Sequence, residues 1–162
     1  MDDPDNEQIQ AEARAFRDRF RTLMLATCTP DGKPEASLAP FLLDDQERPC
    51  VYLSELAAHT ANLLANPRAS LLFAGDEAEA HNPFARQRLT LHCRALELQG
   101  EKAEKILNEM EKAFGETVAL LRALPDFHLF AFEVEEGSYI KGFGQAWALE
   151  GNRLDVSGLR RG

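Results

Sequence analysis

The sequence predicts an α+β protein in which antiparallel strands form a β-barrel with flanking helices. Two observations support this class. Short apolar runs typical of strands recur along the chain, and turn signals such as residues 30–33 (Pro-Asp-Gly-Lys) separate them. Apolar residues at helical spacing occur at intervals between these runs, most clearly in 7–21 and 101–114. Strands joined by short turns, with helices between some of them, are typical of a decorated antiparallel barrel.

The elements are expected in an order that alternates a few helices with many strands. Strands are expected at residues 22–29, 34–43, 50–53, 69–74, 88–98, 127–134 and 139–149, with a short final strand after the turn at 150–153. Helices are expected at 7–21, from Ser54 to Asn66, at 101–114 and at 116–123. The strand at 127–134 is partly apolar on both faces, so we expect it in the centre of the sheet. The strand at 139–149 is expected to bend around Gly142 and Gly144.

Length and composition favour one domain spanning residues 1–162. Hydrophobic residues make up 44% and charged residues 28%, the profile of a soluble globular protein. No apolar run approaches the roughly 20 residues that span a membrane, and the acidic N-terminus shows no secretory signal. We therefore expect a cytoplasmic protein that does not contact membranes. The net charge of −9 argues against nucleic acid as a partner.

The three cysteines predict no metal site. Cys28, Cys50 and Cys93 lie far apart in apolar runs, and no CxxC spacing occurs. We expect reduced thiols that behave as small hydrophobic residues.

An anion-binding junction is predicted where the strand at 50–53 meets the following helix. Ser54 closes the apolar run and is expected to cap the helix that carries His59, Thr60 and Asn62. The backbone N–H groups and the dipole at a helix N-terminus favour phosphate. Three leucines are expected to form the core face of this helix: Leu56, Leu63 and Leu64.

Two arginines, Arg86 and Arg88, flank the entrance to the strand at 88–98. The inward positions of that strand are apolar, so Arg88 needs an anion or a carboxylate as a partner. We favour a bound ligand, and an ion pair with Glu77 or Glu79 is the alternative.

The four histidines allow both binding and structural roles. His59 either contacts a ligand phosphate or is a surface or satisfied core residue. His81 is expected to be exposed, and His92 to point outward, because it is out of phase with the inward residues of its strand. His128 is expected to pack among phenylalanines, with an iron ligand as the alternative. No residue can be given a catalytic role from its pattern.

Four segments, at residues 25–41, 52–72, 76–91 and 140–149, follow one another in the order of a known family. Two motifs are fairly specific together: Ser-x-Leu-x-x-His-Thr-x-Asn-Leu and Phe-Ala-Arg-Gln-Arg-Leu-Thr. On these residues the chain resembles the FMN-binding split β-barrels of the pyridoxamine 5′-phosphate oxidase superfamily. The closer resemblance is to its haem-utilisation branch, the HugZ/HutZ-like proteins.

The resemblance implies a split β-barrel that forms a homodimer, with small-molecule sites between the two barrels. In flavin-binding members, the strand matching 34–41 lines the isoalloxazine ring, which assigns Ser37 and Ala39 to the ring wall. The positions matching Ser54, His59, Thr60 and Asn62 lie at the phosphate side, and Arg88 adds positive charge there.

In the haem-utilising members, the resemblance implies that the same cleft holds haem and that Arg86 and Arg88 meet its propionates. Those members assist haem breakdown with oxygen and an electron donor. They take an axial histidine from a segment near the C-terminus, whereas no histidine follows His128 here. We therefore expect an FMN-binding protein, a flavin-dependent oxidoreductase. A haem-binding protein without flavin is the alternative, and a binding module for a small anion is a third hypothesis.

Overall fold

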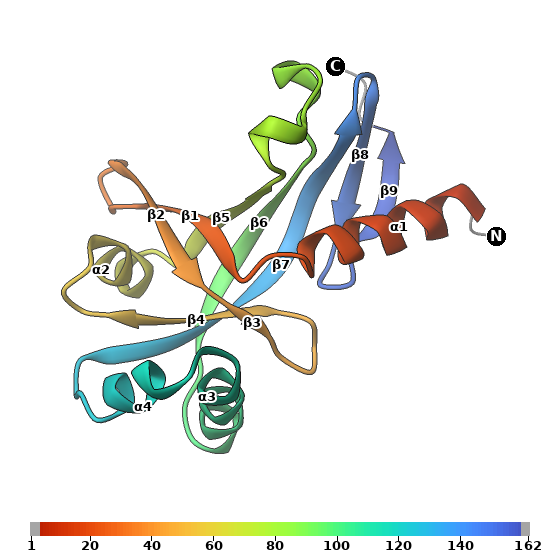
Figure 1. The fold of residues 1–162 in the computed structure, drawn as a ribbon. Helices are drawn as coiled ribbons and strands as arrows, with labels where there is room; N and C mark the ends of the chain where they lie inside the picture. The colour runs from red at the N-terminus through yellow and green to blue at the C-terminus, as the bar shows by residue number, and fades with distance from the viewer. Residues whose placement is uncertain (1–3, 160–162) are drawn as a thin grey trace.

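A curled antiparallel sheet with helices around it forms the protein, as predicted (Figure 1). The structure, a computed structural model, describes residues 4–159. The strands are β1 (Thr22–Cys28), β2 (Pro34–Pro40), β3 (Leu42–Leu43), β4 (Pro49–Ser54), β5 (Arg68–Ala74), β6 (Arg88–Glu97), β7 (Phe127–Gly142), β8 (Gln145–Glu150) and β9 (Asp155–Leu159). The helices are α1 (Pro4–Arg17), α2 (Ala58–Ala65), α3 (Glu101–Phe114) and α4 (Glu116–Arg122), with 3₁₀ turns η1 (Glu77–Glu79) and η2 (Pro83–Ala85).

The strands lie in the order β2-β1-β5-β6-β7-β4-β3, and β8 continues from β7 to β9. Every pairing is antiparallel, which confirms that prediction. Among residues 4–159, none of the helices has the length and apolar character needed to cross a lipid bilayer.

One face of the sheet curls around the main core. Alternate residues of β1, β5 and β6 point into it and are fully buried, such as Leu25, Leu71 and Leu91. Helix α1 adds Phe16 and helix α2 adds Leu63 to the same cluster. Period-two alternation in the strands and the apolar stripe of α1 therefore produce this core.

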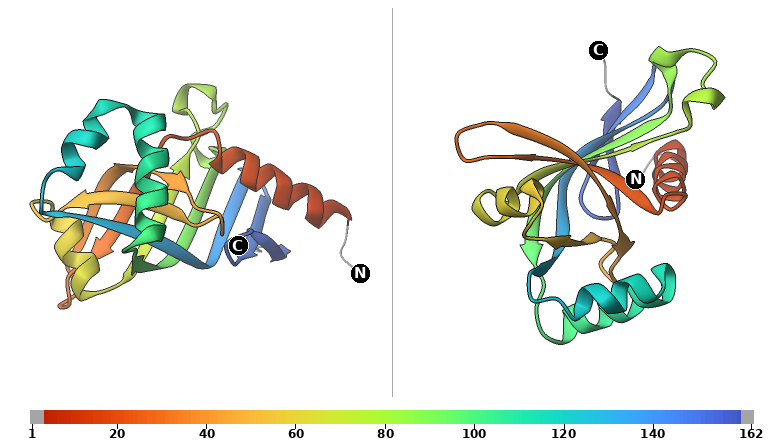
Figure 2. Two further views of the ribbon diagram at one scale, coloured as in Figure 1. Left: turned by 90° about the horizontal axis from the view of Figure 1, so that it is seen from below. Right: turned by 60° about the vertical axis from the view of Figure 1, so that its left-hand side comes forward.

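The central position of β7 is confirmed, because its first half is buried on both faces. Phe130 and Phe132 point into the main core, whereas Leu129 and Ala131 face a second cluster built on α3. Strand β7 pairs with three strands, β4, β6 and β8. Helices α1, α2 and α3 lie at separate places around the sheet (Figure 2).

The other side of β1, β2, β5 and β6 forms a face that we call the outer face. It consists of the side chains that alternate with the buried ones: Met24, Ala26, Leu38, Ser70, Leu72, Arg88, Thr90 and His92. Leu38 is 67% exposed and Met24 is 37% exposed. Large apolar side chains on a sheet face therefore stand in solvent in the single chain.

The prediction that Ser54 caps helix α2 is wrong. The helix begins at Ala58, and its N-cap residue Ala57 makes no side-chain capping bond. The Ser54 hydroxyl instead accepts a hydrogen bond from the Leu56 N–H (3.1 Å), in a turn that separates β4 from the helix. This turn leaves Leu56 92% exposed, and Leu64 is exposed as well, so only Leu63 of the three predicted leucines lies in the core.

The prediction of one bent strand at 139–149 is also wrong. The chain reverses after Gly142, and β8 begins at Gln145 and returns beside β7. Gly144 adopts a φ of +67°, a conformation that glycine reaches without a steric penalty. The two glycines therefore mark a hairpin.

Gly137 allows β6 and β7 to approach closely. A Cβ atom at this position would lie 2.4 Å from the Thr90 carbonyl oxygen and 2.9 Å from a Leu91 methyl carbon. We expect Gly137→Ala to lower the free energy of unfolding by about 1–3 kcal/mol, because the backbone must shift to admit the methyl group. Urea unfolding followed by circular dichroism measures the change.

Gly158→Ala is the matched control, because a Cβ there meets no atom within 4 Å. We expect its free energy of unfolding to stay within about 0.5 kcal/mol of the wild-type value. Equal unfolding midpoints for the two variants would contradict the close approach at Gly137.

Candidate functional site

Two of the predicted site residues meet in a hydrogen-bonded pair. The Ser37 hydroxyl of β2 lies 2.7 Å from Nδ1 of His59 on α2. Burial lowers the pKa of His59, which favours the neutral form of its ring. A neutral imidazole with one nitrogen held by a hydroxyl can accept a proton or a metal at the other nitrogen.

Three further predicted residues hold the turn before α2 in place. The Ser54 hydroxyl donates to a carboxylate oxygen of Asp126 (3.0 Å). The buried Thr60 hydroxyl donates to the Ser54 carbonyl oxygen (2.5 Å), and the buried Asn62 amide donates to the Thr27 hydroxyl (3.0 Å). These polar atoms are therefore used inside the chain to fix α2 against β1 and β4.

Arg86 and Arg88 carry positive charge that no described carboxylate neutralises by an ion pair. Nε of Arg86 donates to the Gly75 carbonyl oxygen (2.6 Å), and Nη1 of Arg88 donates to the Arg86 carbonyl oxygen (2.8 Å). No ion pair within residues 4–159 involves either arginine, so the alternative of a bridge from Arg88 to Glu77 or Glu79 is not observed. Half-buried guanidinium groups without a carboxylate are suited to an anionic ligand.

The predicted site residues fall on two faces of the sheet. Ser37 lies level with Leu25, Leu71 and Leu91 on successive strands and shares their core-facing side. Arg88 points to the outer face, because the next residue, Leu89, is buried in the core. With about 4.8 Å between strands and about 3.3 Å per residue, the two positions lie roughly 14 Å apart across the sheet and roughly 10 Å apart along it. One protomer therefore does not bring Ser37 and His59 together with the arginines.

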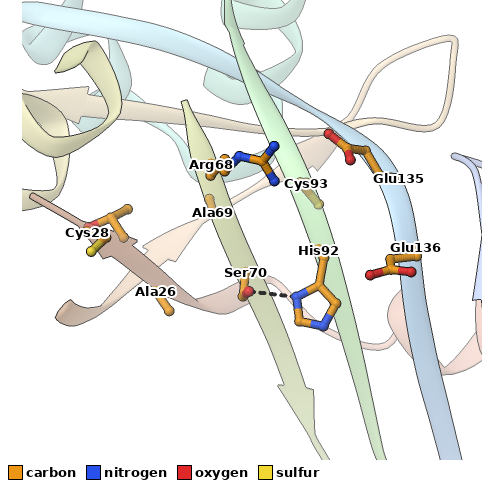
Figure 3. Close-up of a pocket in the computed structure, with 10 residues that line it drawn as sticks. Ala26, Cys28, Arg68, Ala69, Ser70, His92, Cys93, Glu135 and Glu136 are labelled. Carbon is orange, nitrogen blue, oxygen red and sulfur yellow. Dashed lines mark hydrogen bonds between the residues drawn. The ribbon is translucent and has the colours of Figure 1, made fainter. Parts of the chain in front are cut away.

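A cavity of about 450 Å³ lies on the outer face (Figure 3). Its lining combines small side chains, including Ala26, Cys28 and Ser70, with three charged ones, Arg68, Glu135 and Glu136. His92 lines the same cavity, and its Nδ1 lies 2.8 Å from the Ser70 hydroxyl. Sequence reasoning predicted that His92 points outward but missed this cavity.

The pairing of Ser70 with His92 could not be predicted from the sequence alone. Both are out of phase with the buried residues of adjacent strands, and the structure places them directly opposite each other. The missing information was the register of β5 against β6, which depends on the turn between them.

His128 is neither packed in the core nor free to bind iron. Its Nε2 lies 2.6 Å from Glu55 and its Nδ1 lies 2.6 Å from Glu97. These two hydrogen bonds raise the pKa of His128, the bond to Glu55 more than the bond to Glu97. The prediction that His128 packs in the core is therefore wrong, because both of its ring nitrogens bond to carboxylates. Phe130 stacks on one side of the ring.

Contact of Ser54, Thr60 and Asn62 with a ligand stays a prediction. Thr60 and Asn62 are buried and donate to other groups of the protein, and the Ser54 hydroxyl lies against the Asp126 carboxylate, which would repel phosphate. Contact of Ser37, Ala39 and His59 with a ligand stays a prediction. Ala39 itself is buried in the core. The described residues include no cluster of three or more metal-ligating side chains.

Comparison with known families matches residues 9–141 to the family described as pyridoxamine 5′-phosphate oxidase. Among curated proteins, the haem oxygenase HutZ of Vibrio cholerae is 39% identical over 149 residues, which make up 91% of this chain and 84% of HutZ. The family and the haem-related branch indicated by the sequence motifs are thereby confirmed.

Solved structures show the same likeness. HutZ, described there as the haem storage protein of Vibrio cholerae, has a TM-score of 0.71 and 36% identity over 77% of this chain and 89% of that chain. Campylobacter jejuni ChuZ has a TM-score of 0.81 and 31% identity over 94% of this chain and 63% of that chain. A haem-binding protein of Mycobacterium smegmatis has a TM-score of 0.73 and 26% identity over 90% of this chain and 59% of that chain. The split β-barrel fold is confirmed.

The contacts of His128 predict a pH-dependent contribution to stability. Its pKa is higher in the folded chain than in the unfolded chain, so the contribution is complete below about pH 6.5 and is lost as pH rises through the folded pKa. Glu55 is half exposed, so screening limits the effect to about 1 kcal/mol or less. Unfolding free energies of the wild type and His128→Gln from pH 5 to 9 should differ most at the acid end.

His81→Gln is the matched control, because His81 lies in an exposed loop and makes no ion pair within residues 4–159. The difference in unfolding free energy between the wild type and His81→Gln should not increase toward acid pH. A constant difference in unfolding free energy between the wild type and His128→Gln across the pH range would contradict the bonds of His128 to Glu55 and Glu97.

Proposed function

This chain belongs to the pyridoxamine 5′-phosphate oxidase family, and we propose that it binds haem and takes part in haem breakdown. The observation that carries the proposal is its 39% identity to the haem oxygenase HutZ over nearly the whole of both chains. Haem is then the substrate or cargo, and breakdown requires oxygen and an external electron donor.

The charge distribution supports an anionic ligand at the arginines. The chain has a net charge of −9, yet Arg86 and Arg88 have no ion-pair partner among the described carboxylates. Haem carries two propionates, and a guanidinium group binds a carboxylate through charge-assisted hydrogen bonds. We assign Arg88, with Arg86 beside it, to the propionates, in place of the flavin phosphate.

A homodimer would complete the ligand site. The outer face carries Leu38 and Met24 in solvent, and a second copy of this chain would remove them from water. In one protomer, Ser37 and His59 lie on the opposite side of the sheet from Arg88. We propose that these two residues contact a ligand held on the outer face of the partner.

FMN is the less supported ligand for the same cleft. The family match is the observation in its favour. Against it, the hydroxyl and amide groups of Ser54, Thr60 and Asn62 are committed to contacts within the chain. We therefore do not propose a flavin-dependent reaction.

Titration with haemin, followed by addition of ascorbate in air, tests the proposed function. We expect a saturable Soret band with one haem per protomer, and its decay after ascorbate with the appearance of a linear tetrapyrrole product. Binding without decay would indicate haem storage and overturn the assignment to breakdown. Saturable FMN binding without haem binding would overturn the proposal as a whole.

Two arginine variants, measured in the same haemin titration, test whether Arg88 itself binds the ligand. Arg88→Ala should weaken haem binding by about 1.5–3 kcal/mol, or roughly 10- to 150-fold, because a charge-assisted hydrogen bond is lost. Arg153→Ala removes the same charge from an arginine that is 78% exposed in the turn after β8, and its affinity should equal that of the wild type. Equal losses in both variants would mean that net charge alone controls binding.

Light scattering after size-exclusion chromatography tests the dimer. Leu38→Asp introduces a charge into the outer face, and we expect it to convert the dimer to a monomer because a buried unpaired carboxylate is costly. Leu120→Asp is the control, since Leu120 is similarly exposed but lies on α4, away from the outer face. A wild type that is monomeric at all concentrations would contradict the shared cleft.

A further inference from the structure

One histidine of the outer face has the features of a metal ligand. Nδ1 of His92 is held by the Ser70 hydroxyl at 2.8 Å, and within residues 4–159 Nε2 has no hydrogen-bond partner. The second ring nitrogen points away from Ser70 (Figure 3). In the tautomer in which Nδ1 donates to Ser70, Nε2 presents its lone pair. Ligating histidines usually have their other nitrogen fixed by such a hydrogen bond.

The position of His92 in its strand is also irregular. The register between β6 and β7 shifts between His92 and Cys93, because Glu135 and Glu136 of β7 occupy the space of one partner residue. Such a β-bulge changes the local twist and redirects side chains, and bulges are frequent next to functional sites. The bulge lies beside the cavity of about 450 Å³ on the outer face.

His92 and Arg88 lie on the same face of the same strand. They are four residues apart, which corresponds to about 13 Å along β6. Between them the outer face carries Thr90, flanked on β5 by Leu72, and no charged side chain of β6 intervenes. A haem that lies along β6 can reach Arg88 with a propionate while its iron lies over His92, since the arginine side chain and the propionate both extend toward each other.

The other three histidines fit this role less well. Both ring nitrogens of His128 are bonded to carboxylates. His81 lies in the exposed loop between β5 and β6, and no side chain of residues 4–159 fixes its ring. His59 is fixed by Ser37, but it lies on the opposite side of the sheet from the arginines of its own protomer.

We infer that His92 is the axial ligand of the haem iron and that Ser70 is the positioning residue that orients its ring. This inference rests on the proposed function, because it requires that the chain binds haem. The neutral Nε2 would coordinate the iron through its lone pair. The Nδ1–H group would donate a hydrogen bond to the Ser70 hydroxyl. The ligand thus comes from a strand of the barrel itself.

Resonance Raman spectroscopy of the ferrous haem complex tests the inference. The wild type should show an iron–histidine stretching band, and His92→Ala should lack it. Imidazole added to the His92→Ala complex should restore a histidine-like spectrum, because it can occupy the space left by the side chain. A variant that merely folds poorly would not be rescued in this way.

His81→Ala is the matched control, and it should keep the band. Retention of the band in His92→Ala, or its loss in His59→Ala alone, would overturn the assignment. Failure of the wild type to bind haem would refute the proposed function instead, so the two failures can be distinguished.

Ser70→Ala separates positioning from ligation. The iron–histidine band should persist but shift in frequency, because the hydrogen bond at Nδ1 changes the basicity of the ligand. We expect haem affinity to fall by about 10-fold or more, as is typical when the outer partner of a ligand is removed. Ser70→Thr, which keeps the hydroxyl, should restore the wild-type frequency. An unchanged frequency in Ser70→Ala would contradict the positioning role.

Discussion

The pairing of β6 with β7 determines how the neighbouring strands and their side chains are placed. It is the longest ladder in the sheet, running from Arg88 opposite Ile140 to Glu97 opposite Phe130. The close approach at Gly137 and the bulge at Glu135 set the register on either side of His92. Because side chains alternate along a strand, this register decides which residues enter the core and which stay on the outer face.

The two faces of β6 have different roles in this account. The inner face carries Leu89, Leu91 and Cys93, which are buried and stabilise the barrel. Burial raises the pKa of the Cys93 thiol and keeps it protonated. The outer face carries Arg88 and His92, which can meet the propionates and the iron of one haem. A single strand can therefore link stability to ligand binding without a flexible loop, and a rigid strand places ligands more precisely than a loop does.

Much of the fold could be predicted from the sequence because its signals are local. The alternation in β1, β5 and β6, the stripe of α3 and the two-faced β7 each depend on the residues of one element. The errors arose where a neighbouring element decides the outcome. Helix α2 begins only at Ala58 rather than directly after Ser54, and the Ser54 hydroxyl donates to Asp126, which is far away in the sequence.

The candidate site could be predicted only in part, for the same reason. Arg88 was identified because an arginine beside apolar inward positions needs a partner, and the structure leaves it without a carboxylate in residues 4–159. Thr60 and Asn62 hold α2 in place through groups of other elements, the Ser54 carbonyl oxygen and the Thr27 hydroxyl, and their contact with a ligand stays a prediction. The link between Ser70 and His92 requires the strand register, which no single stretch of sequence contains.

We propose that the ligand lies on the outer face of β5 and β6. A crystal structure of the haemin-loaded protein, with the iron located by its anomalous scattering, tests this most directly. We expect an iron peak within bonding distance of Nε2 of His92, with a propionate at Arg88. An iron peak at the turn before α2 in the same protomer, or away from the outer face altogether, would contradict it.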